Sequence, residues 1–178
     1  MNRIIKTVLM TAATILLFGG CDKFFKDDDL TMTKTPYTGN ELRLDGYYYQ
    51  MSSVDGSFDD TYFLYRDGIV LSCGGTPLEE SPFDFMERLL NSQNVTYQKE
   101  KSGWGVFKIQ DSTIAIERWY PLEGGLPAGL SEGVILNDTT FLITSLTRMK
   151  TGEVYERNDL YHFRQFSPKP DSTNTFIP

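Results

Sequence analysis

The chain has 178 residues, of which 40% are hydrophobic and 13% aromatic, and its formal net charge at pH 7 is −7. This length provides one domain with a substantial core and is too short for two comfortable ones. An acidic surface repels nucleic acid and anionic lipid headgroups, so the composition argues against DNA, RNA and peripheral lipid binding.

Residues 1–20 have the features of an export signal. Arg3 and Lys6 give a positively charged start, residues 7–18 are apolar, and two glycines precede Cys21. The apolar run has about 12 residues, whereas a transmembrane helix needs about 20. Without this segment the charge becomes −9, because Arg3 and Lys6 are lost.

The position of Cys21 resembles the signal of bacterial lipoproteins, in which small residues precede a cysteine that becomes the first residue of the mature protein. The resemblance implies that the Cys21 sulfur carries diacylglycerol and that its freed amine is acylated, for example with palmitate. Two or more acyl chains hold a protein durably on a bilayer. The alternative is an ordinary secretory signal followed by a coincidental cysteine.

Residues 21–40 read as a lipidated, acidic and flexible tether. They include the run Asp27-Asp28-Asp29, several threonines and Pro36, and they have few apolar residues to bury. Acidic residues shortly after a lipidated cysteine resemble the signal that sends lipoproteins of the Bacteroidota to the outer face of the outer membrane. That resemblance implies a cell-surface location, while a solvated spacer without a sorting role remains the alternative.

Residues 41–166 alternate with a period of two and carry turn residues between the apolar runs. Asp67-Gly68 is typical of a two-residue hairpin turn. The expected strands are 42–51, 61–66, 69–73, 104–109, 113–120, 133–136, 140–147 and 153–166. Sequential hairpins favour a closed up-and-down barrel, because closure removes exposed sheet edges. The sequence therefore predicts an all-β fold, an antiparallel barrel of about eight strands with one short helix.

The helix is expected after Ser81, a suitable N-cap, with Pro82 at its first position and Phe83, Met86 and Leu90 on one face. An apolar stripe of this kind usually packs on a core, so we expect the helix to plug or cover an open end of the barrel. Several strands are apolar on both faces, which requires a helix, a loop or a partner outside the barrel. The stretch 124–129 is expected to be a flexible connection at the barrel mouth.

Gly46-Tyr47-Tyr48 resembles the glycine-x-aromatic opening of lipocalin-like barrels, and that resemblance implies a cationic residue from the late strand, Arg164, covering the aromatic ring. The segments 104–109, 135–141 and 166–170 resemble a group of Bacteroidota lipoproteins to which no activity is attached. The two resemblances imply a fold and a compartment, and neither implies an activity.

The residues needed for catalysis are nearly absent. His162 is the only histidine, and no Gly-x-Ser-x-Gly turn exists that could present a nucleophile to it. Cys73 ends an apolar strand and is expected to be buried, and no disulfide can form once Cys21 is modified. The acidic stretch 55–60 lacks the spacing of a calcium loop and reads as a hairpin loop. We therefore expect no enzyme activity, no metal and no cofactor.

Three short segments place aspartate before a hydroxyl residue and threonine. They resemble the O-glycosylation acceptor of exported Bacteroidota proteins, which implies modification at Ser112, Thr139 and Ser172. The alternative is that these residues are turn formers, which are favoured for their local hydrogen bonds.

The leading functional expectation is a membrane-anchored surface lipoprotein whose barrel binds a small apolar or amphipathic ligand in an aromatic interior. The candidate lining residues, each of which is alternatively a plain core side chain, are Tyr48, Phe63, Phe107, Ile116, Phe141 and Phe163. The second expectation is an accessory lipoprotein that docks on an outer-membrane protein complex through an outward apolar face. The tail 167–178 is expected to be extended, with Phe176-Ile177 packed on the barrel.

Overall fold

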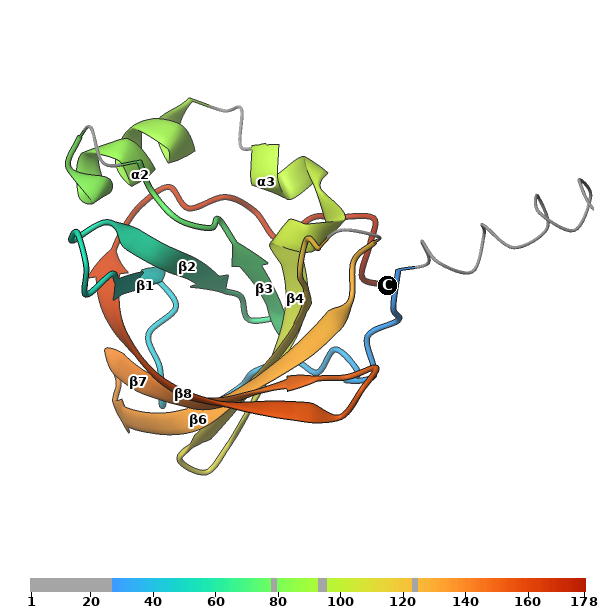
Figure 1. Cartoon of the computed structure of the whole chain (residues 1–178). Coiled ribbons are helices and arrows are strands. Elements are labelled where there is room, and N and C mark those ends of the chain that lie inside the picture. Colours follow the sequence, from blue (N-terminus) through green and yellow to red (C-terminus); the bar gives the residue numbers. More distant parts are fainter. Residues whose placement is uncertain (1–26, 78–79, 93–95, 123–124) are drawn as a thin grey trace, which may run out of the picture.

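Eight antiparallel strands form a closed barrel in the computed structural model, which describes residues 27–77, 80–92, 96–122 and 125–178 (Figure 1). Each strand pairs with its neighbour in the sequence, and the last pairs with the first. The strands are β1 (Gly46–Met51), β2 (Phe58–Leu64), β3 (Ile69–Ser72), β4 (Trp104–Gln110), β5 (Thr113–Trp119), β6 (Ala128–Asn137), β7 (Thr140–Arg148) and β8 (Glu153–Gln165). The predicted up-and-down barrel is confirmed.

Two strands begin earlier than the sequence pattern indicates. β2 starts at Phe58, so the acidic pair Asp59-Asp60 belongs to a strand and not to a hairpin loop. β6 starts at Ala128, so the end of the glycine-rich stretch 124–129 is strand and not flexible connection. Both extensions carry polar or small residues at inward positions, which hides the alternation of apolar residues that marks a strand.

The alternation of each strand separates an interior cluster from an outer cluster. Tyr48 of β1 faces inward and contacts Phe141, with 5.1 Å between ring centroids, whereas its neighbour Tyr47 faces outward against Phe63 at 5.5 Å. Inside the barrel, Tyr161 stacks on Phe141 at 4.8 Å with an interplanar angle of 10°. These ring contacts fill this part of the interior with packed aromatic side chains.

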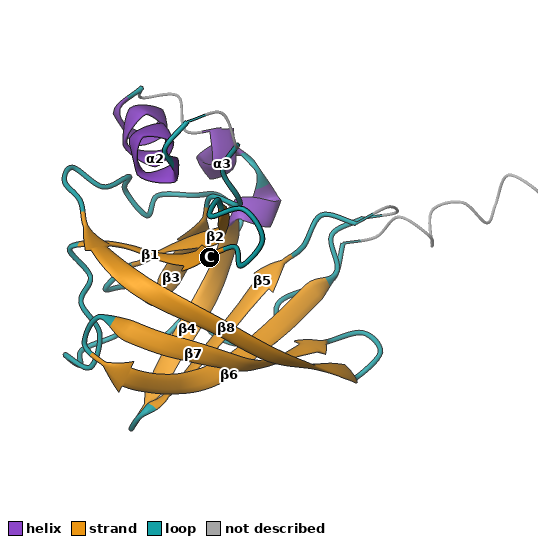
Figure 2. Ribbon diagram, turned by 60° about the vertical axis from the view of Figure 1, so that its left-hand side comes forward, coloured by secondary structure: helices purple, strands orange, loops and turns teal. Residues whose placement is uncertain are grey.

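The outer cluster is covered by the connection between β3 and β4, which contains helix α2 (Pro82–Asn91), the short helix α3 (Thr96–Lys99) and the 3-10 turn Lys101–Gly103. Figure 2 shows α2 lying over the outside of β1 to β3 and not across a barrel end, which corrects the expectation from the sequence. Met86 and Leu90 are buried, and the Phe83 ring lies 5.0 Å from that of Phe58. The helix settles here because the outward side chains of these strands are large and apolar.

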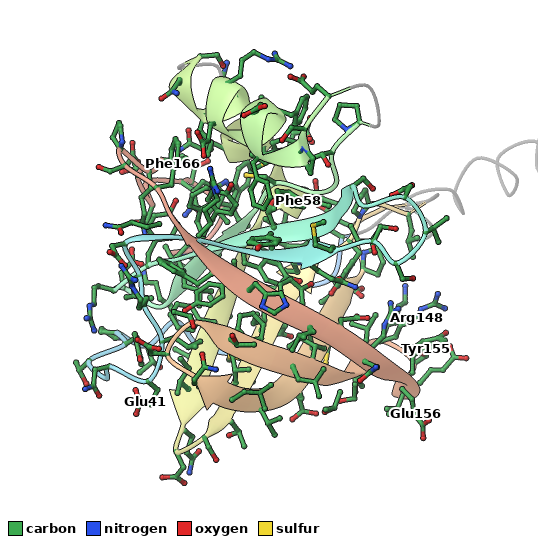
Figure 3. The ribbon with its side chains drawn as sticks, turned by 90° about the vertical axis from the view of Figure 1, so that its left-hand side faces the viewer. Glu41, Phe58, Arg148, Tyr155, Glu156 and Phe166 are labelled. Atoms are coloured by element: carbon green, nitrogen blue, oxygen red, sulfur yellow. The ribbon has the colours of Figure 1, made fainter. Side chains whose placement is uncertain are left out.

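The two ends of the barrel differ. One end, which we call the closed end, holds the β2–β3, β4–β5 and β6–β7 turns. Tyr37 and Leu42 are buried there in the interior cluster. The open end holds the β1–β2, β5–β6 and β7–β8 connections, and the long β3–β4 connection also leaves and rejoins the barrel there. In Figure 3, Glu41 marks the closed end and Arg148, on the opposite side of the molecule, marks the open end.

The N-terminal segment, 27–45, runs along the outside of β5 from the open end to the closed end. Glu117 of β5 is fully buried and accepts hydrogen bonds from the backbone N–H of Thr31 and of Met32. Tyr37 N–H then donates to the Arg66 carbonyl at the closed end. The described part of the expected flexible tether, residues 27–40, is therefore fixed to the barrel, because a buried carboxylate and buried apolar side chains hold it there.

The C-terminal tail, 167–178, returns over the outer cluster. Tyr65 hydroxyl donates to the Pro170 carbonyl, and Ile177 is buried in the outer cluster. Residues 29–34 and 176–178 line one shared groove of about 390 Å³, so the tail ends beside the N-terminal segment. Among the described residues, no helix has the length and apolar character that crossing a membrane requires.

Candidate functional site: a polar pocket at the open end

Near its open end the barrel interior is hollow, and a pocket of about 260 Å³ lies there above the packed aromatic rings. Its charged and polar lining residues are Gln50, Asp59, Asp60, Arg118, Ser131, Arg157 and Asp159. The remaining lining residues are Tyr62, Tyr120, Leu146 and Tyr161. Pockets for drug-sized ligands usually hold about 300 to 1,000 Å³, so this one suits a small molecule or the head of a larger one.

An ion pair between Arg118 of β5 and Asp60 of β2 is the main charged feature of the pocket. Arg118 Nη2 lies 2.6 Å from Asp60 Oδ2, and each side chain is 12% exposed. The other carboxylate oxygen of Asp60 accepts hydrogen bonds from Thr61 N–H at 2.9 Å and from Ser72 Oγ at 2.8 Å. Burial alone would lower the pKa of Arg118, but the nearby Asp60 carboxylate outweighs this effect. The pKa of Arg118 is therefore above the ordinary value of arginine.

The guanidinium of Arg118 is also held between aromatic rings. Its Cζ lies 4.1 Å from the centroid of Tyr120 and 5.6 Å from that of Tyr62, which are cation–π distances. Tyr120 hydroxyl lies 3.3 Å from Ser131 Oγ across the pocket wall. Gly129 makes room for this arrangement, because a Cβ atom there would lie 2.6 Å from the Tyr120 ring. The side chain of Arg118 is therefore fixed in position before any ligand arrives.

One donor of this fixed side chain has no acceptor in the part of the chain that the structure describes. Arg118 Nε is buried and makes no hydrogen bond to the described residues. Buried donors in proteins are nearly always paired, so an unpaired one calls for an explanation such as a bound polar molecule. Leaving such a group unpaired costs about 1–3 kcal/mol.

The charges of the pocket are nearly balanced. Besides the Arg118–Asp60 pair, Arg157 Nε lies 3.8 Å from Asp159 Oδ2 at the rim, and the exposed Asp59 adds one further carboxylate to the lining. Burial raises the pKa of Tyr62, so its phenol stays neutral and can both donate and accept hydrogen bonds. A pocket with paired charges, phenols and a serine hydroxyl suits an uncharged, hydroxyl-rich group better than a simple anion or cation.

The six residues predicted to line a ligand cavity do not line this pocket. Four of them, Tyr48, Phe107, Ile116 and Phe141, are packed against one another or their neighbours in the interior cluster. Phe163 is half-buried beside them, with Arg43 Cζ 4.6 Å from its ring centroid. Phe63 faces outward and belongs to the outer cluster with α2.

Sequence reasoning missed Asp60, Arg118, Tyr120 and Ser131 as site residues. A signal for Arg118 existed, because it stands two and four residues after the inward-facing Ile116 and Ile114. A charge at an inward position of a barrel strand indicates a partner or a ligand inside. For Asp60 no such signal was readable, since its strand was expected to begin one residue later.

The other residues singled out in the sequence lie away from the pocket. Arg164 does not cover the Gly46-x-aromatic motif, because its Cζ lies 4.4 Å from the Phe83 ring centroid and its Nη2 pairs with Glu87 of α2 at 2.6 Å. Cys73 is buried and unpaired, and burial raises its pKa. Among the described residues, no three or more His, Cys, Asp or Glu side chains group in a way that could hold a metal ion.

The proposed modification sites fall in two groups. Cys21 lies outside the described residues. Ser112 is exposed in the β4–β5 turn, whereas the hydroxyls of Thr139 and Ser172 are engaged with Asn137 at 2.8 Å and Asp67 at 2.9 Å. The structure places all three near turns of the closed end, away from the pocket.

Comparison of the chain with protein-family models, with curated proteins and with solved structures finds no match in any of the three. The functional argument therefore rests on the pocket itself.

Proposed function

We propose that this chain is a lipid-anchored, surface-exposed barrel that binds a small amphipathic ligand by its polar end, in the pocket at the open end. The anchor follows from Cys21 behind its apolar signal and the small residues before it. The binding role follows from the shape of the barrel interior and the chemistry of the pocket. The observation that carries it is the largely buried Arg118–Asp60 pair.

A buried ion pair adds little net stability, because desolvation of two charges offsets most of their attraction. In a barrel whose interior is otherwise filled with aromatic and aliphatic side chains, apolar residues at positions 60 and 118 would serve folding as well. The pair, the unpaired Arg118 Nε and the two nearby phenols are better explained as a surface for hydrogen bonds to a ligand.

The ligand class follows from what the pocket can satisfy. An apolar group placed here would leave several buried donors and acceptors unpaired, at about 1–3 kcal/mol each. The packed rings of Tyr161 and Phe141 block entry of an acyl chain deeper into the barrel. An amphipathic molecule would therefore enter with its hydroxyl-rich head and keep its apolar part outside the open end.

The binding test uses the mature chain with Cys21→Ser and octyl glucoside below its micelle concentration, followed by calorimetry. We expect saturable binding that glucose also shows, more weakly. Leu146→Trp fills the pocket and should weaken binding at least tenfold. Leu142→Trp is the matched control, since Leu142 is equally half-buried on the same strand but faces outward. Absence of saturable binding, or equal binding by the two variants, would refute the assignment.

The anchor is tested separately by feeding cells a palmitate analogue. Wild-type protein should be labelled and Cys21→Ser should not be. Protease treatment of intact cells should release the domain if it is displayed on the surface. An unlabelled wild-type protein would end the lipid-anchor proposal without touching the pocket.

A second candidate function is docking on an outer-membrane protein. It is favoured by an outward apolar row in which Val134, Leu142 and Leu160 are register partners across β6, β7 and β8. Val134 and Leu160 are exposed, and no described element covers them. A photo-crosslinker at position 160 should then give one discrete adduct in cells, absent when the crosslinker is moved to Thr151.

A further inference from the structure

The chain enters the fold at the open end of the barrel, and the contacts there are numerous. Lys101 Nζ lies 3.0 Å from Asp27 Oδ2, and Leu126 N–H donates to Asp27 Oδ1 at 3.1 Å. Asp28 N–H donates to the Leu126 carbonyl at 3.0 Å, and its own carbonyl accepts from Trp119 Nε1 at 2.7 Å. The first described residues are thus fixed beside the β5–β6 connection.

The proposed anchor is close to this point. Cys21 precedes Asp27 by six residues, and a fully extended chain of that length spans at most about 22 Å. The closed end lies at or beyond the limit of this reach, because strands of seven to ten residues separate the two ends by roughly 20 Å or more. The lipid can therefore hold the closed end against the bilayer only if the chain from Cys21 to Asp27 is stretched to nearly its full length, whereas the open end needs no such extension.

The rim of the open end carries exposed apolar side chains on three different connections. Val54 of the β1–β2 loop is 89% exposed, Leu122 after β5 is 53% exposed, and Val154 beside the β7–β8 turn is 62% exposed. The same rim carries Arg148 and Glu153, which pair with each other, and the chain as a whole is acidic with a net charge of −7, so charge does not draw this rim to an anionic surface. Apolar tips of this kind suit the interface of a bilayer with neutral headgroups.

Asp27 and Asp28 are fixed at the open end, Cys21 precedes Asp27 by six residues, and the rim is apolar. From these observations we infer that the open end faces the bilayer that holds the anchor, and that the pocket opens onto the lipid surface of this bilayer. The inference rests on the proposed lipid anchor and adds an orientation and a partner surface to it. A bound amphipathic molecule then keeps its apolar part in the bilayer while its head occupies the pocket. Glycans at Ser112, Thr139 or Ser172, if present, would lie on the side away from the membrane.

The experiment measures which end of the barrel lies near the lipid. Mature acylated protein is reconstituted into phosphatidylcholine vesicles whose headgroups carry a spin label. A single fluorophore is attached to Val54→Cys or Val154→Cys at the open end, or to Ser112→Cys at the closed end as the matched control. Cys73 does not interfere, because it is buried. We expect at least twofold stronger quenching at the two open-end positions, with little dependence on salt.

Each outcome has a distinct meaning. Equal quenching at all three positions, or stronger quenching at position 112, overturns the orientation while octyl glucoside binding to the pocket still stands. Protein that fails to float with the vesicles overturns the anchor, and the orientation falls with it. Octyl glucoside binding that fails while open-end quenching persists refutes the ligand and leaves the orientation in place.

Discussion

Replacing Asp60 by asparagine would leave the Arg118 guanidinium in the barrel without its carboxylate. The carbonyl of the introduced amide can still accept from Thr61 N–H and Ser72 Oγ, but its NH2 group then points two donors at Arg118 Nη2. Removing one partner of a buried ion pair typically costs about 3–5 kcal/mol. Because each side chain is 12% exposed, solvent still screens the charge to some extent. We therefore expect Asp60→Asn to lower the free energy of unfolding by about 2–4 kcal/mol.

That loss is a large part of the roughly 5–15 kcal/mol that stabilises a typical domain. With a urea dependence of about 2 kcal/mol per molar, the unfolding midpoint of Asp60→Asn should fall by about 1–2 M. The fluorescence of Trp104 and Trp119 reports the transition, because both indoles are buried.

Two further variants test the reasoning behind this number. Replacing Arg118 by methionine in the Asp60→Asn background removes the unpaired charge, so the double variant should recover to within about 1 kcal/mol of wild type. Arg157→Gln at the rim should change stability by less than about 0.5 kcal/mol, because its pair with Asp159 is long and solvated. A single Asp60→Asn variant as stable as wild type, or a double variant less stable than either single one, would refute the argument.

Glu117→Gln places an NH2 donor against the two backbone N–H groups that the carboxylate now accepts from. Loss of these charge-assisted hydrogen bonds should lower the free energy of unfolding by about 1.5–3 kcal/mol and speed tryptic cleavage at Lys34. Unchanged cleavage would contradict this. Burial lowers the pKa of Lys169 to about 8 from its ordinary 10.5. The unfolded chain therefore binds more protons between these values, and the free energy of unfolding should rise from pH 8 to 10, a rise that Lys169→Met should abolish. In the Cys21→Ser protein, Cys73 should not react with Ellman's reagent at pH 8 until urea unfolds the barrel, because burial raises its pKa. Rapid reaction of the native protein would show that this strand opens.

Strand number was predictable from the sequence because it depends on local patterns, and closure was predictable because sequential hairpins leave no exposed edge when the first strand pairs with the last. Asp67-Gly68 lies in the β2–β3 turn, where Gly68 has a φ of 86° that favours glycine. The pocket was not predictable in the same way. Its inward positions are polar, so the alternation that marks a strand disappears at Asp59 and Asp60, where the site begins.

The N-terminal segment shows a second limit of local reasoning. Its acidic residues have the composition of a solvated spacer, yet Asp27 pairs with Lys101 and Asp28 accepts from Ala128 N–H. These partners are 74 and 100 positions away along the chain, so no sequence window contains both sides of the contact. The face of Phe63 was ambiguous for a related reason, because apolar residues stand on both sides of it in β2.

The groove shared by residues 29–34 and 176–178 has a consequence for engineering. Because these segments lie side by side, a short linker from position 178 to position 27 would allow circular permutation, with new termini in the exposed β4–β5 turn. A lipoprotein signal with its cysteine, placed ahead of the new first residue, would tether the same barrel by its closed end. If the proposed orientation holds, the pocket of the permuted molecule would open toward the extracellular medium instead of toward the membrane.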